Sequence, residues 1–495
     1  MTQVEEAAPL ARVSPHSTVW TRGQRLARTS PVAVFLLLSA LFGALTVAAT
    51  LPLRGPDEPA HFLRAYGILT GEIIPTTTDA SGRKGVWLPA ELYRQMYCYS
   101  VALTGRYRPA GTEWTFPQVL EEYVRLRAGV ATGSAAPVFV PYDGSEGYSP
   151  AAYLAMLPGL ALARLLDLDF VATIYLMRGT SLLLLTGVVA CAIAIVPALG
   201  WAWLLIAMLP SALFSRAMLS ADASSLAYAM MVAALSLRGA YRLPSGSAWM
   251  RSVWMTLCVL GKPPQIVFVL AEALSRPVGQ WLRYWRCVAV VVAPALVLGI
   301  LWPALGSADA GAWRIVNGIS NAADHFRPLW KLGFWLEHPL HFPTLLLGNL
   351  DSVGEYWRQL IGVLGWLDLR LQEWVYPALS LTLAFGLCAA LQVDRSTRRR
   401  LALVSGLIVL GYCGAVFMIF YLVWTPLDGV RIEGVQGRYF VPALPFTAIM
   451  LSAALPRAPS SATGSVVAIF GALLSGVATL EAIFRCDWQL ALLPP

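Results

Sequence analysis

The amino-acid sequence predicts an all-α integral membrane protein that crosses the bilayer many times. Hydrophobic residues make up 57% of the 495 residues and charged residues only 13%, about half the charged share of soluble domains. Many apolar runs approach the roughly 20 residues that a bilayer span needs. This composition excludes a soluble enzyme, a disordered chain and a nucleic-acid-binding protein.

The first predicted span covers residues 31–53 and follows a basic tail, residues 1–30. Arginines in such a tail favour the cytoplasmic side, so we expect the chain to emerge externally at Arg54. The alternative is a cleaved signal peptide, since Val47-Ala48-Ala49 resembles a cleavage site. We prefer a retained helix because the apolar run is long for a signal peptide.

Two long polar segments, residues 54–148 and residues 306–374, are predicted to be external loops. Neither contains a segment that fits a span, and the second is rich in Trp. The sequence therefore predicts one transmembrane domain, residues 31–495, with about 11–13 helical segments. After the first span, the apolar runs lie at 150–166, 170–196, 200–219, 222–237, 252–274, 287–305, 375–393, 401–424, 439–456 and 464–484.

The distribution of basic clusters indicates that some of these runs are broken. Basic clusters flank the run 252–274 on both sides, so both of its ends are expected to be cytoplasmic, as is Arg398–Arg400. Gly261-Lys262-Pro263-Pro264 interrupts that run, and consecutive prolines stop a helix. We predict two short helices that meet at Lys262 on the external side. The number of predicted crossings between 150 and 219 also does not agree with the expected sides of the flanking segments. One of those runs is therefore expected to be broken or re-entrant.

A group of charged residues follows the first span. Asp57 and Glu58 are adjacent carboxylates at the membrane surface, where a charge needs water, a partner or a function. Pro59 favours the first turn of a helix. On that helix, His61 and Arg64 share a face with Glu58 at i, i+3 spacing. A capped interfacial helix with an ordinary polar face is the simpler interpretation of this segment taken alone.

Three further charges lie at the start or the break of a predicted span. They are Asp222, Lys262 and Arg438. An ionisable residue within the membrane indicates a function by default, because a charge at the centre costs about 2.5–3.5 kcal/mol, although snorkelling explains each one singly. Together with Asp57, they indicate a site for a phosphate-bearing substrate and an acid/base step.

Several short pieces of the sequence resemble an uncharacterised bacterial multispanning family that is labelled predicted membrane protein. Residues 56–62 (PDEPAHF), followed by Tyr66 and Gly71, resemble its opening motif. The later pieces occur in the same order: Tyr148-Ser149-Pro150 with Tyr153, Arg178, Ser220-Ala221-Asp222, Gly261-Lys262, Leu364-Gly365-Trp366-Leu367-Asp368 and Gln436-Gly437-Arg438-Tyr439. That family is similar in layout to the GT-C glycosyltransferases, such as protein mannosyltransferases, oligosaccharyltransferases and aminoarabinose transferases.

The resemblance implies a GT-C-like fold and a role for each candidate residue. Asp57 would be catalytic, as general base on the acceptor hydroxyl or as ligand of a divalent metal (Mg²⁺ or Mn²⁺), with Glu58 as its helper. Lys262 and Arg438 would neutralise the donor phosphate, with Arg64 as a third candidate. The remaining candidates for substrate and phosphate binding are His61, Asp222, Gln436 and Tyr439.

We therefore expect a glycosyltransferase of the bacterial inner membrane. It would move a sugar from a polyprenyl-phosphate donor to an envelope glycan, lipid or protein on the periplasmic face. The alternatives are a polysaccharide polymerase or ligase, and a transporter or flippase of a lipid-linked glycan. A transporter should show paired broken helices in two related halves, whereas this sequence shows one clear break and no repeat. Membrane lipids are expected partners, and nucleic acid is not.

Overall fold

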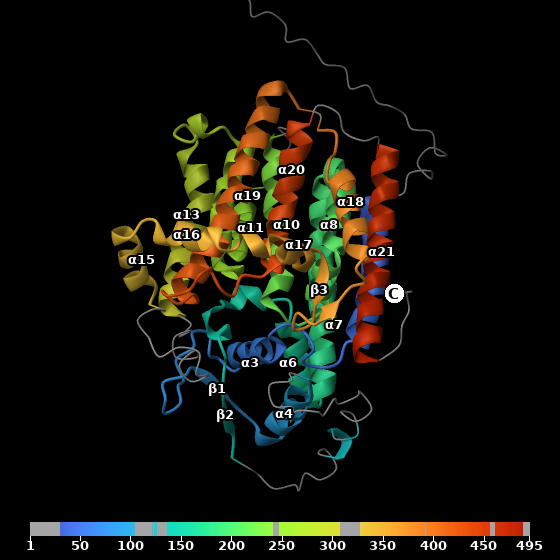
Figure 1. Cartoon of the computed structure of the whole chain (residues 1–495), viewed down its shortest axis with the longest axis vertical. Coiled ribbons are helices and arrows are strands. Elements are labelled where there is room, and N and C mark those ends of the chain that lie inside the picture. The colour runs from blue at the N-terminus through green and yellow to red at the C-terminus, as the bar shows by residue number, and fades with distance from the viewer. Residues whose placement is uncertain are drawn as a thin grey trace, which may run out of the picture.

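The long helices of the computed structural model confirm an all-α polytopic membrane protein. The structure describes residues 30–103, 121, 123–125, 136–240, 247–306, 327–391, 393–455 and 461–488, so residues 1–29 of the basic tail lie outside it. Within this part, six helices are long and apolar enough to cross a membrane. They run along the long axis of the molecule (Figure 1): α2 (Pro31–Ala49), α7 (Phe170–Ile195), α10 (Ala221–Ala240), α13 (Trp285–Leu305), α19 (Arg395–Val423) and α21 (Ser461–Asp487).

The apolar run at 200–219 is broken into two helices, as expected for one of the runs between 150 and 219. It forms α8 (Gly200–Met208) and α9 (Pro210–Ala217), which are bent by 70° at the break. Arg216 stabilises the bend, because its Nη1 donates to the carbonyl of Ala207 at the end of α8, at 2.6 Å. The run at 150–166 is not a span: it forms η2 (Pro150–Ala152) and α6 (Leu157–Leu165), which has only nine residues.

The predicted break at Lys262 is confirmed. The helix α11 (Ala248–Gly261) ends there, and η4 (Pro263–Ala271) and α12 (Glu272–Ser275) follow. Pro264 has no N–H for the carbonyl of Leu260, four residues earlier. The hydroxyl of Ser149 donates to that carbonyl instead, at 2.7 Å. The break is therefore held by the segment that precedes η2.

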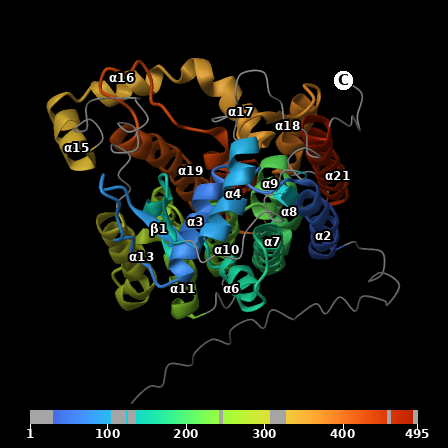
Figure 2. The ribbon, with the colours of Figure 1, turned by 90° about the horizontal axis from the view of Figure 1, so that it is seen from below.

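The described part of segment 54–148 gathers at one end of the helix bundle (Figures 1 and 2). It contains α3 (Glu58–Leu69), β1 (Gly85–Leu88), α4 (Ala90–Leu103), β2 (Val138–Pro141) and η1 (Ser145–Gly147). The two strands are antiparallel, with Gly85 opposite Pro141. Consistent with the sequence, none of these elements is a membrane span.

The described part of the second polar segment, from residue 327 onward, forms short helices that lie crosswise to the long ones, along one side of the bundle (Figures 1 and 2). They are α15 (Pro328–Glu337), α16 (His341–Leu347), η7 (Leu350–Ser352) and α17 (Val353–Gly362), followed by the hairpin of β3 (Val363–Leu364) and β4 (Leu369–Arg370). The remaining elements are η3 (Pro197–Leu199), η5 (Val278–Gln280), α18 (Val375–Gly386), η8 (Gly437–Ala443) and α20 (Leu444–Ala454).

The helix α17 packs directly on the start of η8, and only glycine fits at the contact. The N–H of Gly437 donates to Oε1 of Gln359 at 2.8 Å. A Cβ atom added to Gly437 would lie 1.8 Å from the carbonyl oxygen of Tyr356. The helix α17 thereby positions the residue that follows Gly437, which is Arg438.

Replacing Gly437 by Ala should therefore separate α17 from η8. We expect Gly437→Ala to destabilise the fold by about 1–3 kcal/mol, the usual effect of overpacking. Thermal unfolding of the purified protein in detergent measures this. Gly414→Ala is the control, since a Cβ there meets nothing within 4 Å. Equal melting temperatures for the two variants would show that the contact at Gly437 is not tight.

Candidate functional site

Four charged side chains from distant parts of the sequence meet where the helices begin. Nε of Arg438 lies 3.1 Å from Oδ2 of Asp222, and its Nη2 lies 3.5 Å from Oδ2 of Asp57. The ammonium of Lys262 bonds Oδ1 of Asp222. We call Asp57, Asp222, Lys262 and Arg438 the charged cluster. The structure thus brings together the two acids and two bases that the sequence singled out.

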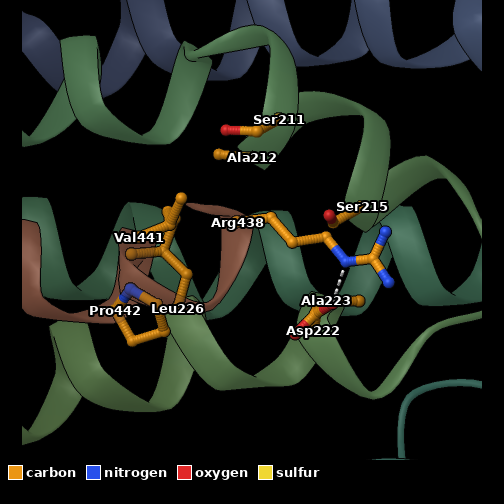
Figure 3. Close-up of a pocket in the computed structure, with 9 residues that line it drawn as sticks. All are labelled: Ser211, Ala212, Ser215, Asp222, Ala223, Leu226, Arg438, Val441 and Pro442. Carbon is orange, nitrogen blue, oxygen red and sulfur yellow. Dashed lines mark ion pairs between the residues drawn. The ribbon is translucent and has the colours of Figure 1, made fainter. Parts of the chain in front are cut away.

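The members of the charged cluster differ sharply in exposure. The side chain of Asp57 is 56% exposed, whereas those of Arg438 and Asp222 are 8% and 12% exposed. The side chain of Lys262 is also buried. Arg438 also lines a small pocket between α9, α10 and η8. Figure 3 shows the guanidinium reaching from η8 to Asp222 and Ser215. Asp57 is therefore the reachable member, and the cations lie deeper.

Two tyrosines complete the surroundings of the cations. Nζ of Lys262 lies 4.4 Å from the ring centre of Tyr439 and 6.0 Å from that of Tyr148, distances at which a ring face attracts a cation. The guanidinium carbon of Arg438 lies 5.3 Å from the Tyr439 ring. Tyr439 is itself stacked on Phe420. Sequence reasoning gave no role to Tyr148, although Tyr148-Ser149-Pro150 was one of the motifs.

The local structure also favours a negatively charged ligand at the cluster. Asp57 directly precedes α3, and Asp222 lies in the first turn of α10. The N-terminus of a helix carries partial positive charge. Because two helix N-termini and two cations meet here, the arrangement is suited to an anion such as a phosphate.

Glu58 lies beside Asp57 in sequence but has a different environment. Its carboxylate is fully buried in a two-pronged ion pair with Arg178, with Nε–Oε1 and Nη2–Oε2 distances of 2.8 and 2.7 Å. The guanidinium of Arg178 also donates to the carbonyls of Thr50 and Leu51, just after α2. The Glu58 carboxylate and the Arg178 guanidinium therefore both have their partners within the protein.

The buried pair fixes the two acids of the charged cluster. Besides Arg178, Glu58 accepts the N–H of Gly55 at 3.0 Å and that of Leu219 at 3.0 Å. Gly55 lies two residues before Asp57, and Leu219 lies three residues before Asp222. Asp57 itself has a positive φ of 52°, a conformation that aspartate and asparagine tolerate better than most residues. The geometry therefore favours a positioning role for Glu58, and its role as the helper of Asp57 stays a prediction.

The comparisons with known proteins identify the family. A model of the family described as predicted membrane protein (DUF2142) matches residues 38–447. The chain belongs to this family. No curated protein and no solved structure matches it. The predicted resemblance to an uncharacterised membrane family is confirmed, while the similarity to GT-C enzymes stays a prediction.

In this DUF2142 protein, the other candidate residues have partners of their own. Arg64 is buried and donates to the carbonyls of Tyr148, Glu72 and Ile73, so it ties these three residues to α3. Gln436 precedes η8, and its Oε1 is buried without a hydrogen bond among the described residues. These contacts leave Arg64 as part of the scaffold, whereas Gln436 keeps an acceptor available.

His61 lies against the cluster as a neutral side chain. Its Nδ1 is 2.9 Å from the hydroxyl of Tyr153. Burial lowers the pKa of His61 from 6.5 to about 4; Lys262 and Arg438 act in the same direction, while Asp57 and Asp222 oppose them. At neutral pH, His61 therefore adds no charge to the site.

We expect protonation of His61 to destabilise the protein in acid. The unfolded chain binds this proton near pH 6.5 and the folded chain only near 4, so the stabilisation is complete above 6.5 and is lost as the pH falls to 4. His61→Gln cannot be protonated, so it should flatten this part of the profile, by roughly 3 kcal/mol. Unfolding in nanodiscs across this pH range measures it. An identical pH profile in the variant would contradict the assignment.

A divalent metal does not fit the residues of the cluster. Its two carboxylates are both engaged by Arg438, and Asp222 also by Lys262. Within the described residues, no group of three His, Cys, Asp or Glu side chains is placed to hold a metal. His341 lies outside the cluster, where it bonds the Tyr421 hydroxyl and the Leu427 carbonyl.

Proposed function

We propose that this protein is a membrane glycosyltransferase of the GT-C type. It transfers a sugar from a lipid-phosphate donor to a cell-envelope acceptor on the external face of the bacterial inner membrane. The observation that carries the proposal is the pairing of two buried cations with one exposed carboxylate, Asp57, in the charged cluster.

The position of the cluster supports a lipid-linked phosphate. Asp222 lies in the first turn of α10, which is one of the membrane-spanning helices. A phosphate bound there lies at the depth of a lipid headgroup, and its hydrocarbon chain can remain in the bilayer. Arg438 offers a planar fork of donors to the phosphate, and Lys262 offers a point charge.

The transfer step follows from these positions. The acceptor hydroxyl oxygen forms a bond to the anomeric carbon of the sugar, and the bond from that carbon to the phosphate oxygen breaks. The lipid phosphate leaves with the electron pair, stabilised by Lys262 and Arg438. The hydroxyl proton goes to the carboxylate of Asp57. Because Asp57 is in loose contact with Arg438 at 3.5 Å, a donor phosphate that takes its place frees Asp57 for the acceptor.

Mass spectrometry of the envelope glycans of a deletion strain tests the proposed function. Loss of one sugar decoration, restored by the wild-type gene and not by Asp57→Asn, supports the transferase. Accumulation of an untranslocated lipid-linked glycan instead would favour the flippase. Loss of whole polysaccharide chains, and not of a single sugar decoration, would favour the polymerase or ligase.

The proposed orientation has its own test. With the native cysteines replaced, a cysteine at Ala80, in segment 54–148, should react with an impermeant reagent added to intact spheroplasts. A cysteine at Ser396, beside Arg398–Arg400, should react only after lysis. Both positions are on the described surface loops or helix ends. The reverse pattern would place the charged cluster on the cytoplasmic side.

A further inference from the structure

The formal charges of the four side chains in the charged cluster sum to zero. Two cations, Lys262 and Arg438, share the buried carboxylate of Asp222. Asp222 lies inside the fold with 12% of its side chain exposed, so its charge stays with the site. The three groups together carry one net positive charge. Asp57 balances it from the mouth of the site through a contact of 3.5 Å, and a ligand can replace that contact.

We infer that the site takes a sugar linked to the lipid through a single phosphate, and not through a diphosphate. This inference rests on the proposed function. A phosphodiester carries one negative charge, which matches the net charge of Lys262, Arg438 and Asp222. A diphosphate diester carries two charges, and the second would remain unbalanced in a buried site, where an unpaired charge is expensive.

The other nearby arginines cannot supply the missing cation. Arg54 is paired with Asp368 and Asp487, at 2.7 and 2.9 Å. Arg178 is paired with Glu58. Arg64 is held by backbone carbonyls. A divalent ion, which usually accompanies a diphosphate, would find only the carboxylate of Asp57 available, because Lys262 and Arg438 both hold Asp222.

Two probes that differ by one phosphate test the inference. They are farnesyl methyl phosphate and farnesyl methyl diphosphate, whose binding to the full chain in nanodiscs is measured by calorimetry in buffer free of divalent ions. We expect the wild-type protein to bind the monophosphate at least about tenfold more tightly, the effect of one charged contact. Equal or tighter binding of the diphosphate would overturn the inference.

Asp222→Asn supplies the matched change in charge. This nearly isosteric variant raises the net charge of the site by one, so we expect it to reduce or reverse the preference for the monophosphate. Asp351→Asn, at an exposed aspartate of η7, is the control and should keep the wild-type preference. An unaltered preference in folded Asp222→Asn would contradict the charge balance. If that variant does not fold, the binding of the two probes to the wild-type protein still tests the inference.

The outcomes separate this inference from the proposed function. Binding of neither probe would remove the phosphate site and the proposed function with it. Tighter binding of the diphosphate would leave the transferase in place and overturn only the single-phosphate donor.

Discussion

Asp57→Asn should reduce sugar transfer by about 10²–10⁴-fold, the usual contribution of a general base. The substitution removes the charge and proton affinity of the side chain while keeping its size. It also suits the backbone, because asparagine tolerates the positive φ of 52° at this position. Transfer by the purified protein, followed with a radiolabelled donor, measures the effect.

The loss must be distinguished from unfolding or poor insertion. Asp57→Asn should melt at the wild-type temperature, because its side chain is 56% exposed and has one loose contact. Asp351→Asn, which changes an exposed aspartate outside the cluster, should transfer at the wild-type rate. Transfer by Asp57→Asn at the rate of this control would show that Asp57 is not the base.

Breaking the Glu58–Arg178 pair should have the largest effect on stability. Glu58→Gln or Arg178→Met leaves a buried charge without its partner, and we expect either to destabilise the fold by about 3–5 kcal/mol. Combining the two removes both charges, so the double variant should lose less than the sum of the single variants. Unfolding in nanodiscs measures all three.

An exposed ion pair is the matched control. Arg370 and Glu355 are 3.0 Å apart at the surface, with side chains 47% and 33% exposed. Glu355→Gln should change the stability by less than about 1 kcal/mol. A folded Glu58→Gln with wild-type stability and greatly reduced transfer would contradict the positioning role. It would instead make Glu58 the helper of Asp57.

The membrane fold was predictable because it depends on composition and on the length of the apolar runs. The break at Lys262 was predictable as well, since consecutive prolines remove the donors that a continuing helix needs. The sequence placed the bend between α8 and α9 only somewhere within residues 150–219. Pro210 alone does not show in which direction the chain continues after it. The short α6 was missed, since an apolar run of 150–166 has the composition of a span whether or not it is helical throughout.

The candidate site was only partly predictable. Asp57, Asp222, Lys262 and Arg438 stood out because charges at the ends of apolar runs are rare. The different environments of Glu58 and Asp57 could not be predicted. The burial of Glu58 depends on Arg178, which lies 120 residues away along the chain. Spacing along α3 grouped Glu58 with His61 and Arg64, whereas their actual partners come from other parts of the fold.

The most direct test of the transferase is the stoichiometry of the reaction in detergent micelles, where no second compartment exists. The purified protein is given a lipid-phosphate sugar and an envelope acceptor fraction. We predict that one free lipid phosphate is released for each sugar that becomes attached to acceptor, and that Asp57→Asn releases neither. An unchanged donor in micelles, combined with movement of the same lipid across proteoliposome membranes, would contradict the transferase and establish a flippase.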